Sequence, residues 1–124
     1  MRINIKFALS QVKAELFDTP TGRAIYESLP LQRNVNRWGE EIYFEVPVQC
    51  ALEENARAEV EEGDLAYWPN MPAFCIFFGP TPVSNSGTPV AASPVNVFGR
   101  VLALDKAILS AIPEDENVLV ERAD

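Results

Sequence analysis

The chain has 124 residues, a length that usually forms one domain, so we expect a single domain over residues 1–124. Its formal net charge of −8 repels the phosphate backbone of nucleic acids, and no apolar run reaches the roughly 18 to 20 residues of a membrane-spanning helix. We therefore expect neither nucleic acid nor a membrane as a partner. The N-terminus lacks the pattern of a secretory signal, which favours a cytoplasmic protein.

The composition favours a mostly β fold. Hydrophobic residues make up 48% of the chain and charged residues 23%, which provides enough apolar surface for a folded core. Ten prolines and six glycines are spread along the chain, as is typical of turns between many short strands.

The N-terminal third predicts a hairpin followed by a helix. Polar and apolar residues alternate over residues 2–9 and again over residues 12–17, which is the period of a strand. Thr19 followed by Pro20 is a helix-start signal, because a threonine oxygen can accept orphan amide hydrogens and proline suits the first helical position. The helix should end near Pro30.

The segment NRWGEEIYFEVPV, residues 36–48, contains the next predicted strand, over residues 40–46. Alternation divides this strand into two faces. The face expected to point inward carries Ile42, Phe44 and Val46, and the face expected to point outward carries Glu41, Tyr43 and Glu45. We interpret the Glu40–Glu41 pair as strand-edge acids, because neighbours on a strand project to opposite faces and do not share a pocket.

The second half of the chain predicts further strands. Residues 51–62 should form a surface loop with a short strand, and residues 65–68 and 73–78 are two apolar strands separated by a hairpin-like connection. Both faces of 73–78 should be buried. Residues 79–94 carry four prolines and no periodicity, so they predict a long loop.

The C-terminal quarter completes the predicted elements. Residues 95–103 resume as a strand, residues 104–112 allow a short helix, and residues 118–121 form a last strand.

Several catalytic and cofactor motifs are missing. The chain contains no histidine, which removes Ser-His-Asp and Cys-His catalysis. Glycine-rich phosphate-binding motifs and clustered aspartates are missing too, so we expect no cofactor and no tightly bound metal. Cys50 and Cys75 are too far apart for a C-x-x-C motif, and packing is the ordinary role of such thiols.

Several segments resemble cyclophilins in the right order. ELFDTPTGRAIYESL resembles the strand, proline and helix near the start of a cyclophilin, and VNVFGRVLALDKAILSAI resembles the strand and helix near its end. NRWGEEIYFEVPV, GDLAYWP, FFGPTP and PVNVFG resemble more closely a small prokaryotic cyclophilin-like family of largely unassigned function. The resemblance implies a closed β-barrel of about eight strands with two short helices, one against each open end.

Cyclophilins are peptidyl-prolyl isomerases, but the resemblance does not carry over their catalytic residues. Where a cyclophilin has its arginine in F-H-R-x-x-P, this chain reads Tyr43-Phe44-Glu45-Val46-Pro47. The histidine before V-V-F-G in many cyclophilins is Val95 here, and the M-x-Q-G-G-D stretch has no counterpart. Arg37 could approach such a site from the preceding loop.

Three hypotheses of function follow. The first is a non-catalytic binding module for a small ligand or an extended peptide, because aromatic residues interleave with polar ones beside a long loop. Its candidate groove consists of Trp38, Glu40, Tyr43, Trp68, Phe77, Thr81, Ser93 and Asn96. The alternative is a weak peptidyl-prolyl isomerase with a modified site. The third is an assembly subunit, a homo-oligomer paired through the outward face of residues 40–46.

Overall fold

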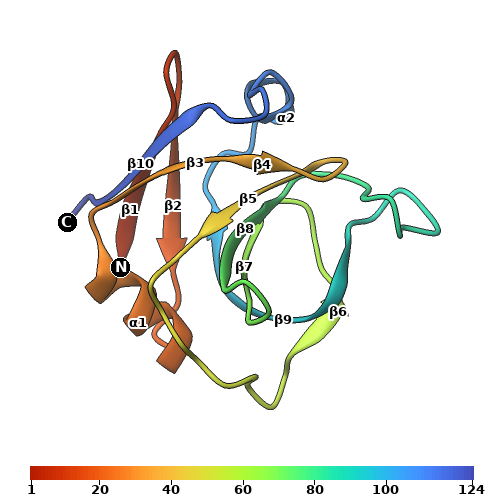
Figure 1. Ribbon diagram of the computed structural model, residues 1–124, viewed down its shortest axis with the longest axis horizontal. Coiled ribbons are helices and arrows are strands. Elements are labelled where there is room, and N and C mark those ends of the chain that lie inside the picture. Colours follow the sequence, from red (N-terminus) through yellow and green to blue (C-terminus); the bar gives the residue numbers. More distant parts are fainter.

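The computed structural model describes residues 1–124 and consists mainly of antiparallel sheet, with 43% of the residues in strands and 11% in two helices. The mostly β prediction is confirmed. The elements, labelled in Figure 1, are β1 (Arg2–Lys6), β2 (Gln11–Leu16), α1 (Pro20–Ser28), β3 (Leu31–Asn34), β4 (Asn36–Arg37), β5 (Glu41–Glu45), β6 (Arg57–Glu59), β7 (Asp64–Trp68), β8 (Ala73–Phe77), β9 (Val90–Val101), α2 (Lys106–Ser110) and β10 (Asn117–Arg122).

The N-terminal hairpin and helix form as the sequence predicts. β1 and β2 pair antiparallel, with Ile3 opposite Ala14. Thr19 caps α1, since its Oγ1 accepts a hydrogen bond from the Gly22 amide at 3.0 Å. Ile25 is buried on the face of α1 that packs against the main core. Figure 1 shows α1 and α2 apart from each other, and both helices contribute buried residues to the main core.

The sheet curls strongly, and its two ends lie on one chain segment. The strand order is β3-β10-β1-β2-β9-β7-β8-β5-β4, with β6 paired to β9. β3 and β4 are separated only by Val35, whose amide donates to the Glu116 carbonyl at 2.9 Å and whose carbonyl accepts from the Asp115 amide at 2.8 Å. The sheet is not closed by hydrogen bonds, so a closed barrel is not confirmed. The strands number ten instead of about eight.

The concave face of the sheet encloses the main core, a cluster of 25 buried residues. Ile42 and Phe44 point into this core from β5, as their alternation predicts. Phe44 lies opposite Phe74 on β8, and their rings stack at 4.8 Å. The Phe98 ring meets Phe74 edge-on at 5.0 Å. These aromatic contacts tie β5, β8 and β9 together across the core.

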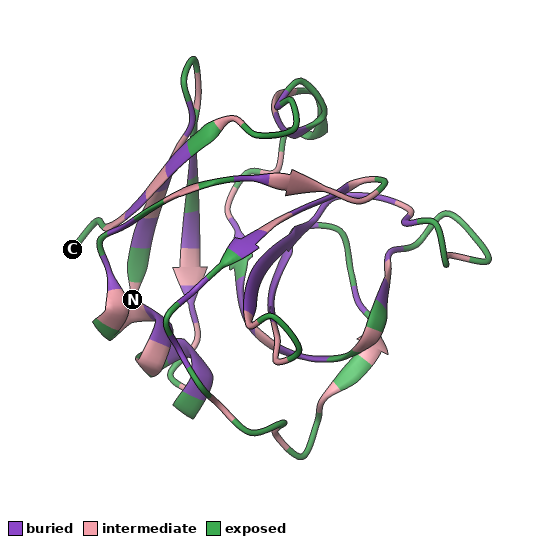
Figure 2. Ribbon diagram, in the orientation of Figure 1, coloured by how far each residue is buried: buried purple, intermediate pink, exposed green.

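Strand β8 is buried on both faces, as predicted (Figure 2). Its Phe74 and Ile76 belong to the main core. The opposite face contributes to a second cluster, which consists of Val60, Ala66, Ala73, Cys75, Phe77, Ala91 and Val95. The sheet therefore has apolar packing on both sides of β8.

Strand β9 is longer than predicted and changes partner along its length. It begins at Val90 instead of Val95, so the loop after β8 covers residues 78–89 and not 79–94. The β9 segment before Asn96 pairs with β6 through a shifted register, and the segment from Asn96 pairs with β7 and β2. The predicted loop extends too far because Pro94 is a turn signal, whereas here the proline lies in a strand at an irregular edge pairing, where it is tolerated.

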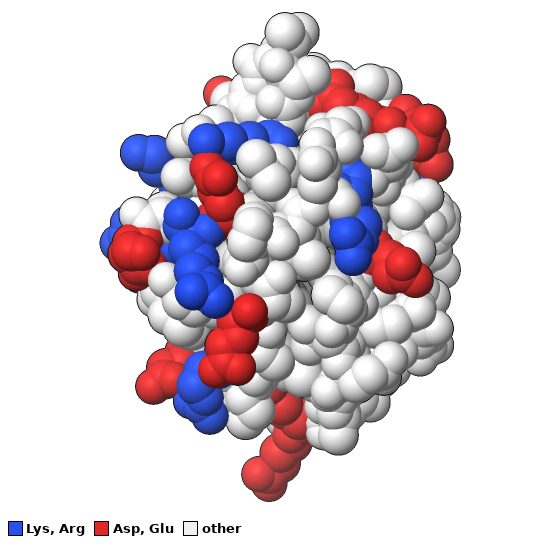
Figure 3. All heavy atoms as spheres, turned by 60° about the vertical axis from the view of Figure 1, so that its left-hand side comes forward, with Lys and Arg blue, Asp and Glu red and all other residues white.

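The face shown in Figure 3 carries positive and negative side chains in alternation. Arg2 pairs with Glu15 at 2.9 Å, Lys6 with Glu121 at 2.5 Å, and Arg23 with Asp18 at 2.5 Å. These pairs are partly or fully exposed, so each contributes little to stability. None of the helices has the length and hydropathy needed to cross a membrane.

Replacement of Phe44 by alanine tests the aromatic contacts of the main core. We expect Phe44→Ala to lower the free energy of unfolding by about 3 to 5 kcal/mol, because it removes a fully buried ring and leaves a cavity. The matched control is Leu9→Ala, since Leu9 is 99% exposed and its loss should cost less than about 0.5 kcal/mol. Urea denaturation measures both values. Equal effects of the two substitutions would contradict this core.

Candidate functional site

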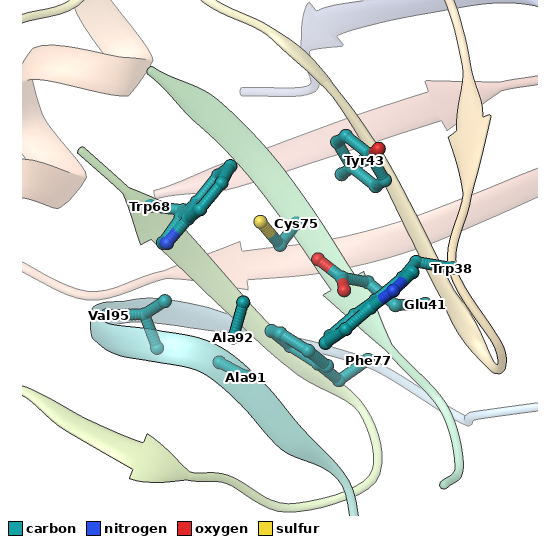
Figure 4. A pocket seen from close by; sticks show the side chains of 9 residues that line it. All are labelled: Trp38, Glu41, Tyr43, Trp68, Cys75, Phe77, Ala91, Ala92 and Val95. Atoms are coloured by element: carbon teal, nitrogen blue, oxygen red, sulfur yellow. The ribbon is translucent and has the colours of Figure 1, made fainter. Parts of the chain in front are cut away.

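A cavity of about 240 Å³ lies on the face of β8 opposite the main core. Figure 4 shows its nine lining side chains, which come from β5, β7, β8, β9 and the turn before β5. They are Trp38, Glu41, Tyr43, Trp68, Cys75, Phe77, Ala91, Ala92 and Val95. Eight are hydrophobic, and the exception is the carboxylate of Glu41.

The register of β5 and β8 determines the floor of the cavity. Glu41 lies opposite Phe77, and Tyr43 lies opposite Cys75. All four side chains point to the same face, because pairs directly opposite each other in a sheet share a face. Glu41, Cys75 and Phe77 are buried and Tyr43 is half-buried, so the cavity is deep at β8 and opens toward Tyr43.

The two tryptophans form opposite walls. Trp68 ends β7, and its indole Nε1 donates a hydrogen bond of 2.7 Å to Ser93 Oγ, which fixes the ring against β9. Trp38 lies in the turn before β5, and its backbone amide donates to the Glu41 carbonyl at 3.0 Å.

The turn that carries Trp38 is held against the loop after β8. Gly39 has φ +59, and a Cβ there would lie 3.0 Å from the Pro80 carbonyl oxygen. Glycine is needed at this position both for its left-handed backbone and for the close approach. The Glu40 amide also donates to the Pro80 carbonyl, at 2.9 Å. The position of Trp38 thus depends on residues 78–89.

Glu41 has unusual electrostatics for a surface-strand acid. Only 5% of its surface is exposed, and burial raises its pKa from the ordinary 4.5 to about 7. The neighbouring Cys75 thiol partly opposes that rise in the pKa. Burial, and then the nearby Glu41, raise the pKa of Cys75 well above its usual value and raise that of Tyr43 as well. No positively charged side chain lines the cavity.

Four of the eight candidate residues from the sequence line this cavity: Trp38, Tyr43, Trp68 and Phe77. A fifth, Ser93, supports the site through its hydrogen bond to Trp68. The structure thus brings five of the candidates together around one hollow.

The other three candidates lie outside the cavity. Asn96 is buried on the far side of β9, where its amide bonds Thr21, Ala51 and Glu53. Thr81 is buried in the loop after β8, and its hydroxyl donates to the Val90 carbonyl. Both residues hold loops in place.

Glu40 is the third candidate outside the cavity. The carboxylate that lines the cavity belongs instead to its neighbour Glu41. β5 begins at Glu41, so Glu40 belongs to the preceding turn and its side chain packs against Gly79. The expected outward face of β5 is also wrong in part, because Glu41 and Tyr43 line the cavity and only Glu45 is exposed. The surface proposed for a homo-oligomer is therefore mostly cavity wall. Glu41 and Tyr43 are two residues apart on a strand and so share a face, and this spacing could have identified Glu41 once Tyr43 was a candidate.

Arg37 does not approach the cavity. Its guanidinium Nη1 donates to the carbonyls of Leu109, Ser110 and Ile112 at 3.2, 3.2 and 2.7 Å, at the C-terminal end of α2. Its Cζ also lies 5.3 Å from the centre of the Phe78 ring, which belongs to the main core. A cation at the C-terminal end of a helix is favourable, so Arg37 has a structural role.

Other chemical sites are few. No group of three or more His, Cys, Asp or Glu side chains is arranged to hold a metal ion. A second hollow of about 270 Å³ lies between β2, the segment after β9 and α2, and it lacks an aromatic wall.

Comparison with known proteins agrees with the fold. A family model described as cyclophilin-like matches residues 1–121. The hypothetical protein AF2241 from Archaeoglobus fulgidus has a similar structure, with a TM-score of 0.83, 42% sequence identity, and coverage of 99% of this chain and 95% of that one. McbB, solved in complex with tryptophan, has a TM-score of 0.74 and 14% identity; the match covers 97% of this chain and 44% of McbB. No protein of curated function matches significantly.

The raised pKa of Glu41 predicts a pH-dependent cost to stability. Between about pH 4.5 and pH 7 the unfolded chain releases this proton while the folded chain keeps it, so the free energy of unfolding falls as pH rises. Glu41→Gln removes this contribution. The free energy of unfolding of Glu41→Gln minus that of the unsubstituted protein should therefore increase by about 2 to 3 kcal/mol from pH 5 to pH 8.

Urea denaturation of both proteins at the two pH values measures this difference. Other titrating groups, including Asp64 with its raised pKa, are present in both proteins and cancel. A stability difference that stays constant with pH would show that Glu41 titrates normally.

Proposed function

Since the chain belongs to the cyclophilin-like family, and since one fold hosts many functions, we propose from the site itself that the protein binds a small organic ligand without catalysing a reaction. The carrying observation is the cavity beside β8, which combines aromatic walls with a single buried carboxylate. Concave apolar sites with few polar groups are the usual form of small-molecule sites.

The size of the cavity favours a ligand about as large as one aromatic ring with a short substituent. An engineered apolar cavity of about 150 Å³ holds benzene, and this one measures about 240 Å³. An extended peptide would place only one side chain in it. We therefore prefer a small ligand to a peptide.

The similarity to McbB supports an aromatic ligand. McbB was solved in complex with tryptophan, and the two proteins share a fold. The tryptophan side chain is an indole ring, so indole is a suitable first compound to test.

The alternative, weak prolyl isomerase activity, has less support. The resemblance to cyclophilins suggests a site with an arginine, but no arginine lines the cavity, and Arg37 is bound to the end of α2. Without a cation near the substrate carbonyl, the electrostatic stabilisation of the twisted amide is lost.

Binding can be followed through the two tryptophans, because the chain has no others and both line the cavity. We expect indole at millimolar concentration to shift the NMR signals of both indole N–H groups. Ala92→Phe should weaken this response severalfold, since Ala92 lies at the exposed edge of the cavity and a ring there would occupy it. Ala111→Phe, at an exposed position after α2, is the matched control and should leave the response unchanged. The absence of any shift would contradict the proposal.

A coupled proline-isomerisation assay separates the two functions. With micromolar protein we expect the rate of the uncatalysed reaction, which takes tens to hundreds of seconds at 25 °C. A rate that rises in proportion to the protein concentration would instead establish the isomerase alternative.

A further inference from the structure

We propose that the ligand of this cavity is an organic ammonium ion, an amine with one compact apolar group, whose nitrogen binds beside the Glu41 carboxylate among the surrounding aromatic rings. This inference rests on the proposed function and narrows it to one chemical class.

The Glu41 carboxylate has no cationic partner. Only 5% of the surface of this residue is exposed, and the structure gives its carboxylate no ion pair. The thiol of Cys75 lies nearby, but a thiol is only a weak hydrogen-bond donor. Burying a carboxylate without a cation is unfavourable, so a ligand that brings a positive charge supplies the missing partner.

Aromatic rings are arranged around that carboxylate. In Figure 4 the Glu41 carboxylate points into the hollow next to Trp38, with Phe77 below and Trp68 across the opening. Aromatic faces attract cations, and cages of such rings recognise alkylated ammonium groups. The hydrogen bond from Trp68 to Ser93 fixes one wall before any ligand arrives, which lowers the entropic cost of binding.

The charges around the cavity disfavour anionic ligands. No lysine or arginine lines the cavity, so a carboxylate or phosphate would find no charged partner there. The net charge of −8 further raises the local concentration of cations and lowers that of anions. An amine without an acidic group suits the site better than a free amino acid.

The pH dependence follows from the groups that face Glu41. Tyr43 on the same strand and Cys75 on β8 are the titratable ones, while β7, β9 and the turn before β5 contribute only Trp68, Ala91, Ala92, Val95 and Trp38. Burial raises the pKa values of Tyr43 and Cys75 away from neutral pH, so Glu41, with its pKa of about 7, is the group in the cavity whose charge changes near neutral pH. An ammonium ion binds the ionised carboxylate, so its affinity should rise at least tenfold from pH 5.5 to pH 8.

The test uses three compounds with one ring and different charge: benzylamine, benzyl alcohol and benzoate. Tryptophan fluorescence excited at 295 nm gives their dissociation constants at pH 8. We expect benzylamine to bind at least tenfold more tightly than benzyl alcohol, and benzoate not to bind. Glu41→Gln should weaken benzylamine at least tenfold and change benzyl alcohol by less than about twofold. Glu45→Gln, which changes an exposed carboxylate of the same strand outside the cavity, should leave both unchanged.

The outcomes separate the two proposals. If benzyl alcohol binds as tightly as benzylamine, or if Glu41→Gln binds benzylamine normally, the ammonium inference is overturned and the cavity remains a ligand site. If none of the compounds binds and indole also gives no response, both proposals fail. The pH dependence of benzylamine binding to the unsubstituted protein decides the matter if Glu41→Gln does not fold, because a constant affinity from pH 5.5 to pH 8 would overturn the inference.

Discussion

The alternation of side chains along β5 is the constraint on which both the core and the cavity depend. Ile42 and Phe44 point into the main core, so Glu41 and Tyr43 must point the other way. A register shift of one residue would place a carboxylate in the core and expose two large apolar groups, which the stacked Phe44 and Phe74 rings prevent. The packing that stabilises the fold therefore also places Glu41 in the cavity.

The burial of Glu41 works against stability at neutral pH, and the fold offers it little compensation. A glutamine of the same shape would avoid the cost of a buried charge, and a leucine would fill the apolar site. Local departures from what is best for folding are expected at functional sites, where a binding group must remain incompletely satisfied. The contrast with Asn96 is instructive, since that buried polar group has its hydrogen bonds satisfied by Thr21, Ala51 and Glu53. It belongs to the scaffold for that reason.

Alternation along the sequence predicted the β1–β2 hairpin and β5, a capping signal predicted the start of α1, and apolar runs predicted β7 and β8. Local pattern did not predict β3 and β4, because LQRNVNR is largely polar and becomes strand only through its distant partners β10 and β5. It also shortened β9, because Pro94 is a turn signal in the sequence and is accommodated by the bulged pairing with β6. In each case a long-range pairing outweighed the local preference.

The sequence predicted only part of the cavity lining, because the small residues of the lining give no signal in a sequence. Large aromatic side chains are typical of binding sites, so the sequence predicted four of the lining residues: Trp38, Tyr43, Trp68 and Phe77. A hollow, however, also needs an opposite wall that does not fill it, and here that wall is Ala91, Ala92 and Val95 of β9. In the sequence Ala91 and Ala92 belong to the proline-containing stretch 79–94 that predicts a loop, and Val95 begins the next predicted strand. Because their short side chains leave the space between the two tryptophans free, the alanines of β9 limit the size of the ligand while the rings and Glu41 determine its chemistry.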